Sequence, residues 1–285
     1  MVVSIGCHLE FEDDQTPSRV IVERYRATIE EDEAWEVLRP VHRRGGGTEF
    51  DLAAEYCASD DPLDRRVGTD ILSELGTERV GGTFIEESLK LLIPMLADPE
   101  STVAASAAHS LAHRGDPAAI PHLVGISEHS DVEVRMGVAH AIMGHEEPEA
   151  IRTLIRLSTD SDASVRDWAL FGLGTQIDTD TPDIRDALAV GVGDDNGDAR
   201  AEAHVGLARR GDDRVVEALL AELQRPQVGS LSLEAAAAIA APQLAAPLQE
   251  LQDRWASHGD LEEPFATLIR EAIATCENQS PPDRS

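Results

Sequence analysis

The feature of this sequence that most constrains its fold is an internal repeat. The segment SVRDWALFGLG (164–174) has counterparts upstream in EVRMGVAHAIMG and downstream in DARAEAHVGLARRG. The matching Arg135 and Arg166 are 31 residues apart, and Arg200 follows Arg166 after 34 residues. Self-similarity at such a period is typical of a stack of repeated supersecondary units, each of which buries its apolar face against its neighbours.

Each repeat contains the signals of two short helices. Its first half begins with Asp and Val-Arg, continues through an alanine-rich stretch and ends near Leu-Gly. Its second half begins with Asp or Pro and has apolar residues at helical spacing, as in EEPEAIRTLIRL (146–157). Asp favours the N-cap, Pro suits the first helical turn, and Gly ends helices. We therefore predict an all-α fold, a right-handed α-α superhelix of about six to seven units.

The pattern resembles the HEAT-repeat family, in particular the short bacterial form that also occurs in phycobilin lyases. The resemblance covers roughly residues 31 to 258. It implies a stack of helix pairs with an extended binding surface. The residues that carry it, besides the alanine columns between them, are Asp131, Val134, Arg135, Asp162, Val165, Arg166, Gly211 and Asp212.

The chain is expected to divide into four segments. Residues 1–30 are predicted to form an N-terminal arm or small hairpin, because residues 3–11 alternate at strand period and Val20 to Tyr25 suits a second short strand. Residues 31–258 form the repeat array, and residues 259–278 form a capping helix at its end. Residues 279–285 are expected to be disordered.

Equivalent positions of the first helices form apolar columns. We count from the Val-like position at the start of each first helix, such as Val134 or Val165. Four residues later the residue is small or apolar, and eight residues later it is Leu or Ile. Both columns share one helix face and are therefore predicted to be core. The two columns are Gly68, Ala107, Val138, Ala169, Ala203 and Ala235, and Leu72, Leu111, Ile142, Leu173, Leu207 and Ile239.

Trp168 and Phe171 are large aromatic residues in columns that other repeats leave mixed or polar. Two interpretations are open. In one, the long loop 175–183 folds over both rings, which then belong to the core. In the other, the pair anchors a protein partner, because buried aromatic residues dominate interface energetics.

An Asp that caps each first helix, with an Arg four residues later, is predicted to form a structural ladder between repeats. Its members are Asp131, Arg135, Asp162, Arg166 and Arg200.

Basic residues recur on the second helices of the middle repeats. In HEAT stacks these helices usually line the concave face, so His122, Arg152, Arg156 and Arg185 are candidate binding residues for an acidic peptide or a carboxylate. The alternative is that these side chains balance nearby Asp and Glu.

The net charge of −30 argues against nucleic-acid binding, which needs clustered Lys and Arg. No apolar run spans a bilayer, so a cytoplasmic protein without membrane contact is expected.

No catalytic, metal or cofactor site is predicted. His109 and His113 have a zinc-like spacing but no obvious third ligand. His145-Glu146 is a single His-Glu pair, whereas deoxyhypusine hydroxylase, a HEAT-repeat di-iron enzyme, needs several such pairs.

The sequence leaves three hypotheses for the function. The first is a non-catalytic scaffold or adaptor that binds another protein, of unknown identity. The second is an accessory subunit of a lyase-type or other enzyme complex, which rests on the family resemblance. The third is an acidic DNA-mimic inhibitor of a basic protein, which rests on charge alone.

Overall fold

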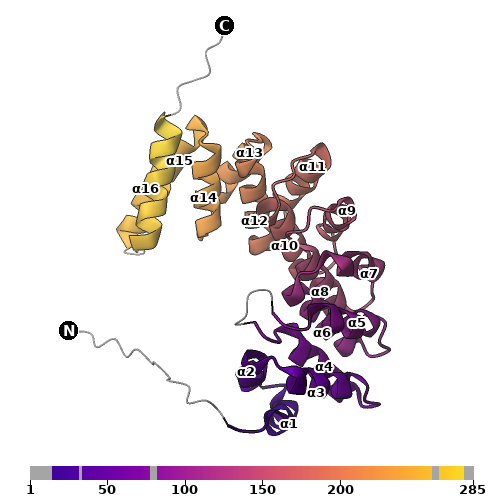
Figure 1. Ribbon diagram of the computed structural model, residues 1–285. Coiled ribbons are helices and arrows are strands. Elements are labelled where there is room, and N and C mark those ends of the chain that lie inside the picture. The colour runs from indigo at the N-terminus through magenta and orange to yellow at the C-terminus, as the bar shows by residue number, and fades with distance from the viewer. Residues whose placement is uncertain (1–14, 32–33, 78–81, 259–262, 279–285) are drawn as a thin grey trace, which may run out of the picture. The chain divides into compact units, whose positions relative to one another are not determined.

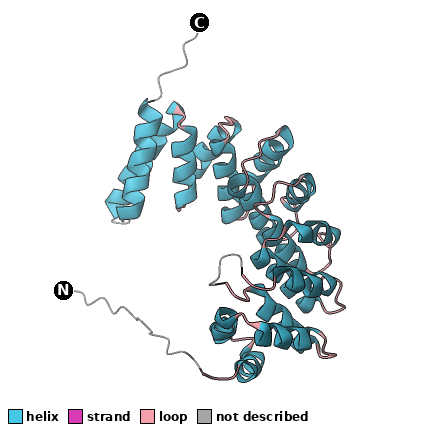
Figure 2. Cartoon of the chain, viewed as in Figure 1, coloured by secondary structure: helices cyan, strands magenta, loops and turns pink. Residues whose placement is uncertain are grey.

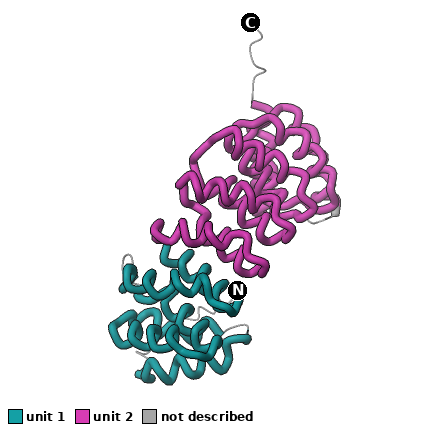
Figure 3. Tube along the Cα trace, turned by 90° about the vertical axis from the view of Figure 1, so that its right-hand side faces the viewer, with its two compact units in different colours: residues 1–115 teal, residues 116–285 magenta. Residues whose placement is uncertain are grey.

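The structure is a computed structural model that describes residues 15–31, 34–77, 82–258 and 263–278 (Figure 1). In this part of the chain all regular elements are helices, as predicted (Figure 2). None of the described helices is long and apolar enough to cross a membrane. The chain forms two compact units, residues 1–115 and residues 116–285 (Figure 3).

In the first unit α3 packs on α4, α4 on α6, and α1 on α2. The predicted strand at Val20 to Tyr25 is wrong, because these residues lie in α1. Ile21, Val22 and Tyr25 are buried together on one face of that helix. The prediction failed because an apolar run this short fits a strand period and a helix period equally well. The strand predicted at residues 3–11 lies outside the described residues. The helices of this unit are α1 (Ser18–Thr28), α2 (Ala34–Arg44), α3 (Gly47–Cys57), α4 (Pro62–Ser73), α5 (Ile85–Met95) and α6 (Ser101–Arg114).

The second unit has two layers of helices. Figure 1 shows α8, α10, α12, α14 and α16 in its inner layer and α7, α9, α11 and α13 in its outer layer. A 3-10 turn, η1 (Pro117–Ala119), precedes α7, a π-helical turn, η2 (Gly172–Gln176), follows α10, and a second 3-10 turn, η3 (Pro242–Leu244), precedes α15. The α-helices are α7 (Ile120–Gly125), α8 (Val132–Ile142), α9 (Pro148–Leu157), α10 (Ala163–Phe171), α11 (Pro182–Gly191), α12 (Gly197–Arg209), α13 (Arg214–Glu222), α14 (Ser230–Ile239), α15 (Ala245–His258) and α16 (Glu263–Asn278).

Small residues bring the inner helices of the second unit close together. Ala169, Ala203 and Ala235 are fully buried, and α10, α12 and α14 contact one another in sequence. At Gly206 of α12 an added Cβ would lie 2.7 Å from the Cα of Gly174 in η2, so only glycine fits there. The predicted core columns are therefore confirmed here, except that Ile239, in the last inner repeat helix, is only half-buried.

The predicted helix caps are present. The Asp131 carboxylate accepts a hydrogen bond from the Glu133 amide at 2.9 Å and so caps α8. Asp162 caps α10 in the same way, with 2.9 Å to the Ser164 amide. Each cap satisfies a backbone donor that has no partner within the helix.

The arginine ladder forms, but with different acids from those predicted. Arg135 donates to both carboxylate oxygens of Asp160, at 2.8 and 2.9 Å, and Arg166 donates to both oxygens of Asp194, at 2.6 and 2.8 Å. Asp131 and Asp162 are occupied by capping, so the ladder uses the acid at the start of the next repeat. Arg200 ends the series with Glu222 as its partner, at 2.9 Å.

Asp160 and Asp194 each lie two residues before the N-cap residue of the next first helix. This spacing is a sequence signal from which the ladder acids could have been predicted. Asp160 accepts a hydrogen bond from the Asp162 amide, and Asp194 accepts one from the Asn196 amide, each at 2.9 Å. One carboxylate thus orders the loop before a helix and holds the arginine of the preceding repeat.

Candidate functional site

The aromatic patch, defined as His140, Trp168 and Phe171, lies in the inner layer of the second unit. The Trp168 ring centroid is 4.8 Å from that of His140 and 6.0 Å from that of Phe171, the latter in an edge-on geometry. His140 comes from α8, and the other two come from α10. All three side chains are half-buried, so each ring keeps a solvent-accessible part.

The loop 175–183 is fixed by hydrogen bonds to Glu146 and Arg210, and the Thr175 hydroxyl donates to the Phe171 carbonyl at 2.9 Å. The Glu146 carboxylate accepts hydrogen bonds from the Asp178 amide at 3.0 Å and from the Thr179 hydroxyl at 2.7 Å. The Arg210 guanidinium donates to the carbonyls of Ile177 and Thr179. Glu146, which the sequence did not assign to a metal site, therefore fixes a loop.

Four carboxylates on α10, α12 and α14 interact with one another, and we call them the inner-layer carboxylates: Asp167, Asp198, Glu202 and Glu234. Burial is the main cause that raises the pKa of Glu202 to about 7, and the charges of Asp167, Glu234 and Asp198 raise it further. Burial, followed by the charge of Asp198, also raises the pKa of Asp167. The carboxylates are thus close enough to repel one another.

The basic residues predicted to line a concave groove lie in the outer layer of this unit. His122 is on α7, Arg152 and Arg156 are on α9, and Arg185 is on α11. The prediction that second helices line the concave face is wrong here, because the alanine-rich first helices approach each other more closely and form the inner side (Figure 1).

Two of these arginines have acidic partners. Arg156 donates to Glu128 at 2.7 Å, and Arg185 donates to both carboxylate oxygens of Asp180 at 2.6 and 2.7 Å. His122 and Arg152 are exposed. This arrangement fits the alternative interpretation, in which the basic side chains balance nearby acids.

A second aromatic and histidine cluster, in the first unit, was not found by sequence analysis. The centroid of the partly exposed Trp35 ring lies 5.1 Å from that of His42, with the rings tilted by 46°, and 6.4 Å from that of His113, with the rings stacked. Glu74 lies 3.4 Å from His113. Within the described residues, no group of three or more His, Cys, Asp or Glu side chains is placed to hold a metal ion.

Comparison with known proteins agrees with this architecture. A family model of HEAT repeats matches residues 89–174. Protein YibA of Escherichia coli (strain K12) is 30% identical over 205 residues, which cover 70% of this chain and 72% of YibA. The X-ray structure of Escherichia coli YibA matches 92% of this chain and 96% of that chain, with 26% identity and a TM-score of 0.71.

Phycocyanin lyase from Nostoc sp. PCC7120 is a more distant match. The structure of its two-protein complex shows 15% identity over 94% of this chain and 98% of that chain, with a TM-score of 0.46. A likeness of this degree supports no argument about function. Fold and matches together define a HEAT-repeat protein. More narrowly, the chain belongs to the family of HEAT-repeat proteins that includes YibA.

Proposed function

We propose that this HEAT-repeat protein is a non-catalytic scaffold that binds another protein through the aromatic patch. The observation that carries the proposal is the half-buried pair Trp168 and Phe171 in an inner layer whose helices contact each other through small residues such as Ala169 and Ala203. Tryptophan in a partly enclosed position is the residue most enriched among interface hot spots. A repeat array supplies a long surface on both sides of such an anchor.

The accessory-subunit and DNA-mimic hypotheses stay predictions. The phycocyanin lyase likeness is too distant to favour the first. The second rests on net charge, which also serves solubility.

The proposal is tested by comparing two arginine substitutions on opposite layers of the second unit. Phe171→Arg places a charge in the aromatic patch, whereas Val190→Arg places one at a 66% exposed apolar position of α11 in the outer layer. Immobilised wild type and variants are exposed to lysate of the host cell, and captured proteins are identified by mass spectrometry. Circular dichroism verifies that each variant is folded.

A protein captured by wild type and by Val190→Arg, but lost from folded Phe171→Arg, is the expected result. The patch is not the anchor if Phe171→Arg keeps every partner that wild type captures. The scaffold function itself is contradicted if wild type captures nothing above the level of an unrelated acidic protein.

A further inference from the structure

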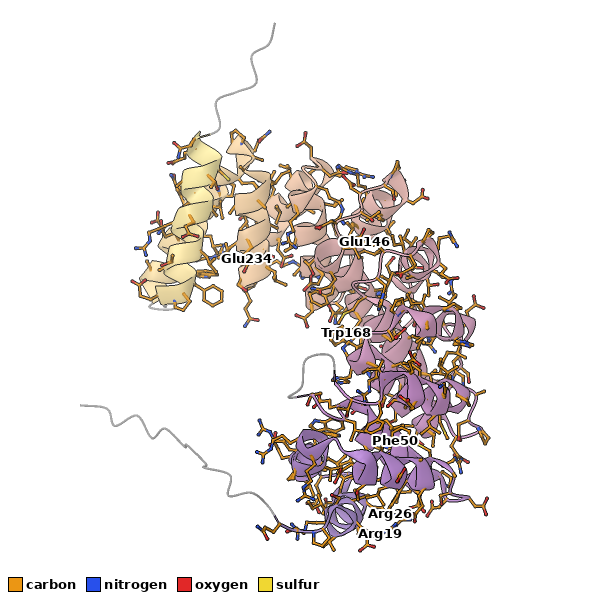
Figure 4. All side chains as sticks on the ribbon, in the orientation of Figure 1. Arg19, Arg26, Phe50, Glu146, Trp168 and Glu234 are labelled. Carbon is orange, nitrogen blue, oxygen red and sulfur yellow. The ribbon has the colours of Figure 1, made fainter. Side chains whose placement is uncertain are left out.

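The aromatic patch is bordered by negative charge along the inner layer. Glu202 occupies on α12 the repeat position that Trp168 occupies on α10, and Glu234 occupies it on α14. These three helices contact one another in sequence, so the three side chains form a row. Figure 4 shows Trp168 and Glu234 on the same inner side of the second unit.

More negative than positive charge surrounds Glu202. Its Oε2 atom is buried and has no hydrogen-bond partner among the residues that the structure describes. The charges of Asp167, Glu234 and Asp198 all disfavour ionisation of Glu202, and Arg209 on the same helix is the cation that opposes them. Glu202 as a whole is only half-buried, so a ligand that brings a hydrogen-bond donor and a positive charge to its accessible part reduces the repulsion among these carboxylates.

The chemistry of the border selects among ligands. An anionic ligand, nucleic acid included, meets repulsion from four carboxylates. A purely apolar segment covers the rings but removes water from the carboxylates without replacing its hydrogen bonds. An arginine side chain suits both the aromatic rings and the carboxylates, because its planar guanidinium stacks on an aromatic face while its N–H groups donate to a carboxylate.

We infer that the aromatic patch and the inner-layer carboxylates bind an arginine-bearing segment of a partner protein, with the guanidinium between Trp168 and Glu202. This inference rests on the proposed function and adds the chemistry of the partner. Apolar contacts with Phe171 hold the neighbouring part of the segment.

The test uses a fluorescein-labelled peptide in which arginine alternates with glycine and serine, titrated with the full-length protein and followed by fluorescence anisotropy. Wild type is expected to bind this peptide. Trp168→Ala and Glu202→Gln are each expected to weaken binding by about tenfold or more, since each removes one half of the contact. Phe171→Ala is the substitute if Trp168→Ala does not fold.

Two controls separate this site from general acidity. Glu217→Gln removes one charge from an exposed position of α13 in the outer layer and is expected to change the dissociation constant by less than about twofold. A peptide with citrulline in place of arginine keeps the shape of the side chain without its charge, and it is expected to bind much more weakly than the arginine peptide.

The inference is overturned if the arginine peptide does not bind, if the citrulline peptide binds equally well, or if Glu217→Gln weakens binding as much as Glu202→Gln. Such a failure differs from failure of the proposed function. A partner lost on Phe171→Arg still identifies the patch as an anchor when the peptide fails, whereas partners retained by Phe171→Arg contradict the anchor directly.

Discussion

Glu202 combines burial with repulsion, and this gives it a measurable effect on stability. Its pKa is raised to about 7 in the folded chain, from 4.5 for an unperturbed Glu, first by burial and then by the charges of Asp167, Glu234 and Asp198. Between these two values the folded chain binds more protons than the unfolded chain, so this group makes the free energy of unfolding fall as pH rises.

Glu202→Gln is therefore expected to stabilise the protein at pH 8 and to have little effect at pH 4. The gain is on the order of 1 kcal/mol, less than the full pKa shift implies because the side chain is partly exposed to solvent. Urea unfolding at both pH values measures it, with Glu217→Gln as control. Loss of stability on Glu202→Gln at pH 8 would mean that Glu202 has a stabilising contact in the free protein.

His204 has the opposite effect to Glu202 on how the free energy of unfolding changes with pH. It is fully buried in α12, and burial lowers its pKa to about 4 from 6.5. The unfolded chain binds the extra proton between these values, so the stability that His204 supports is present above pH 6.5 and is lost as pH falls towards 4.

His204→Ala tests this at a position where sister helices carry Ala139, Leu170 and Ala236. Between pH 7 and pH 5, wild type is expected to lose about 2 kcal/mol of unfolding free energy relative to the variant. The comparison of two chains cancels the effect of the many carboxylates that titrate in both. Parallel pH profiles for wild type and variant would show that His204 does not titrate as its burial requires.

At the scale of the element, the ladder gives each repeat a fixed connection to the next. Both carboxylate oxygens of Asp194 accept from Arg166, and the Arg166 guanidinium also donates to the Asp160 carbonyl at 2.9 Å. The Asp194 side chain is only 8% exposed. This pairing holds the pKa of Asp194 below its usual range, with the Arg166 hydrogen bond as the main cause.

Arg166→Ala is expected to destabilise the protein by about 2–3 kcal/mol, because it leaves a largely buried carboxylate without a partner. Arg156→Ala breaks an exposed pair with Glu128 and one hydrogen bond to the Ser127 hydroxyl, but it leaves no buried charge without a partner, so it is expected to cost about 1 kcal/mol. Chemical denaturation of both variants and wild type compares the two. Equal losses would show that burial of the ladder pair adds nothing.

Close packing between elements gives a second prediction, at Gly206. In an open helix Gly→Ala stabilises by up to about 1 kcal/mol. At Gly206, however, the new methyl group would meet the backbone of Gly174 and the side chain of Leu188, both under 3.0 Å. We expect Gly206→Ala to destabilise by about 1–3 kcal/mol.

The matched control is Gly125→Ala, at the end of α7, where an added Cβ meets nothing within 4 Å. It is expected to be neutral or slightly stabilising. Thermal unfolding of both variants decides the matter, and a stable Gly206→Ala protein would mean that α12 and η2 move apart without cost.

The helices and most of the apolar columns followed from the sequence because periodicity and capping are local properties. The ladder partners did not, since Asp160 and Asp194 lie outside the helices and their role appears only when two repeats are placed side by side. Trp35 was missed for a different reason. It stands in the degenerate first repeat, where no sister column marks it as unusual.

Over the whole chain, the repeat pattern predicted the helical-repeat fold, but the expectation that second helices form the inner layer is wrong for the second unit (Figure 1). The relevant signal was present in residue size. Ala169, Ala203 and Ala235 are fully buried and let neighbouring first helices approach closely. The layer of smaller residues is shorter along the stack and so forms its inner side. The small residues at these helix contacts are therefore the signal for which helices face inward.

The net charge of −30 leads to the last prediction, on the effect of salt. Two effects of opposite sign compete. Salt screens repulsion among exposed carboxylates, which stabilises the folded chain, and it weakens ion pairs, which destabilises it. The ladder pairs are largely buried, with side chains of Arg135 and Asp160 only 13% and 10% exposed, so salt screens them less than the exposed acids.

We therefore expect the melting temperature to rise by several degrees between about 20 mM and 300 mM sodium chloride, with glucose of equal osmolality as a control for solvent effects. A melting temperature that falls with salt would show that ion pairs, and not repulsion, dominate the electrostatics of this protein.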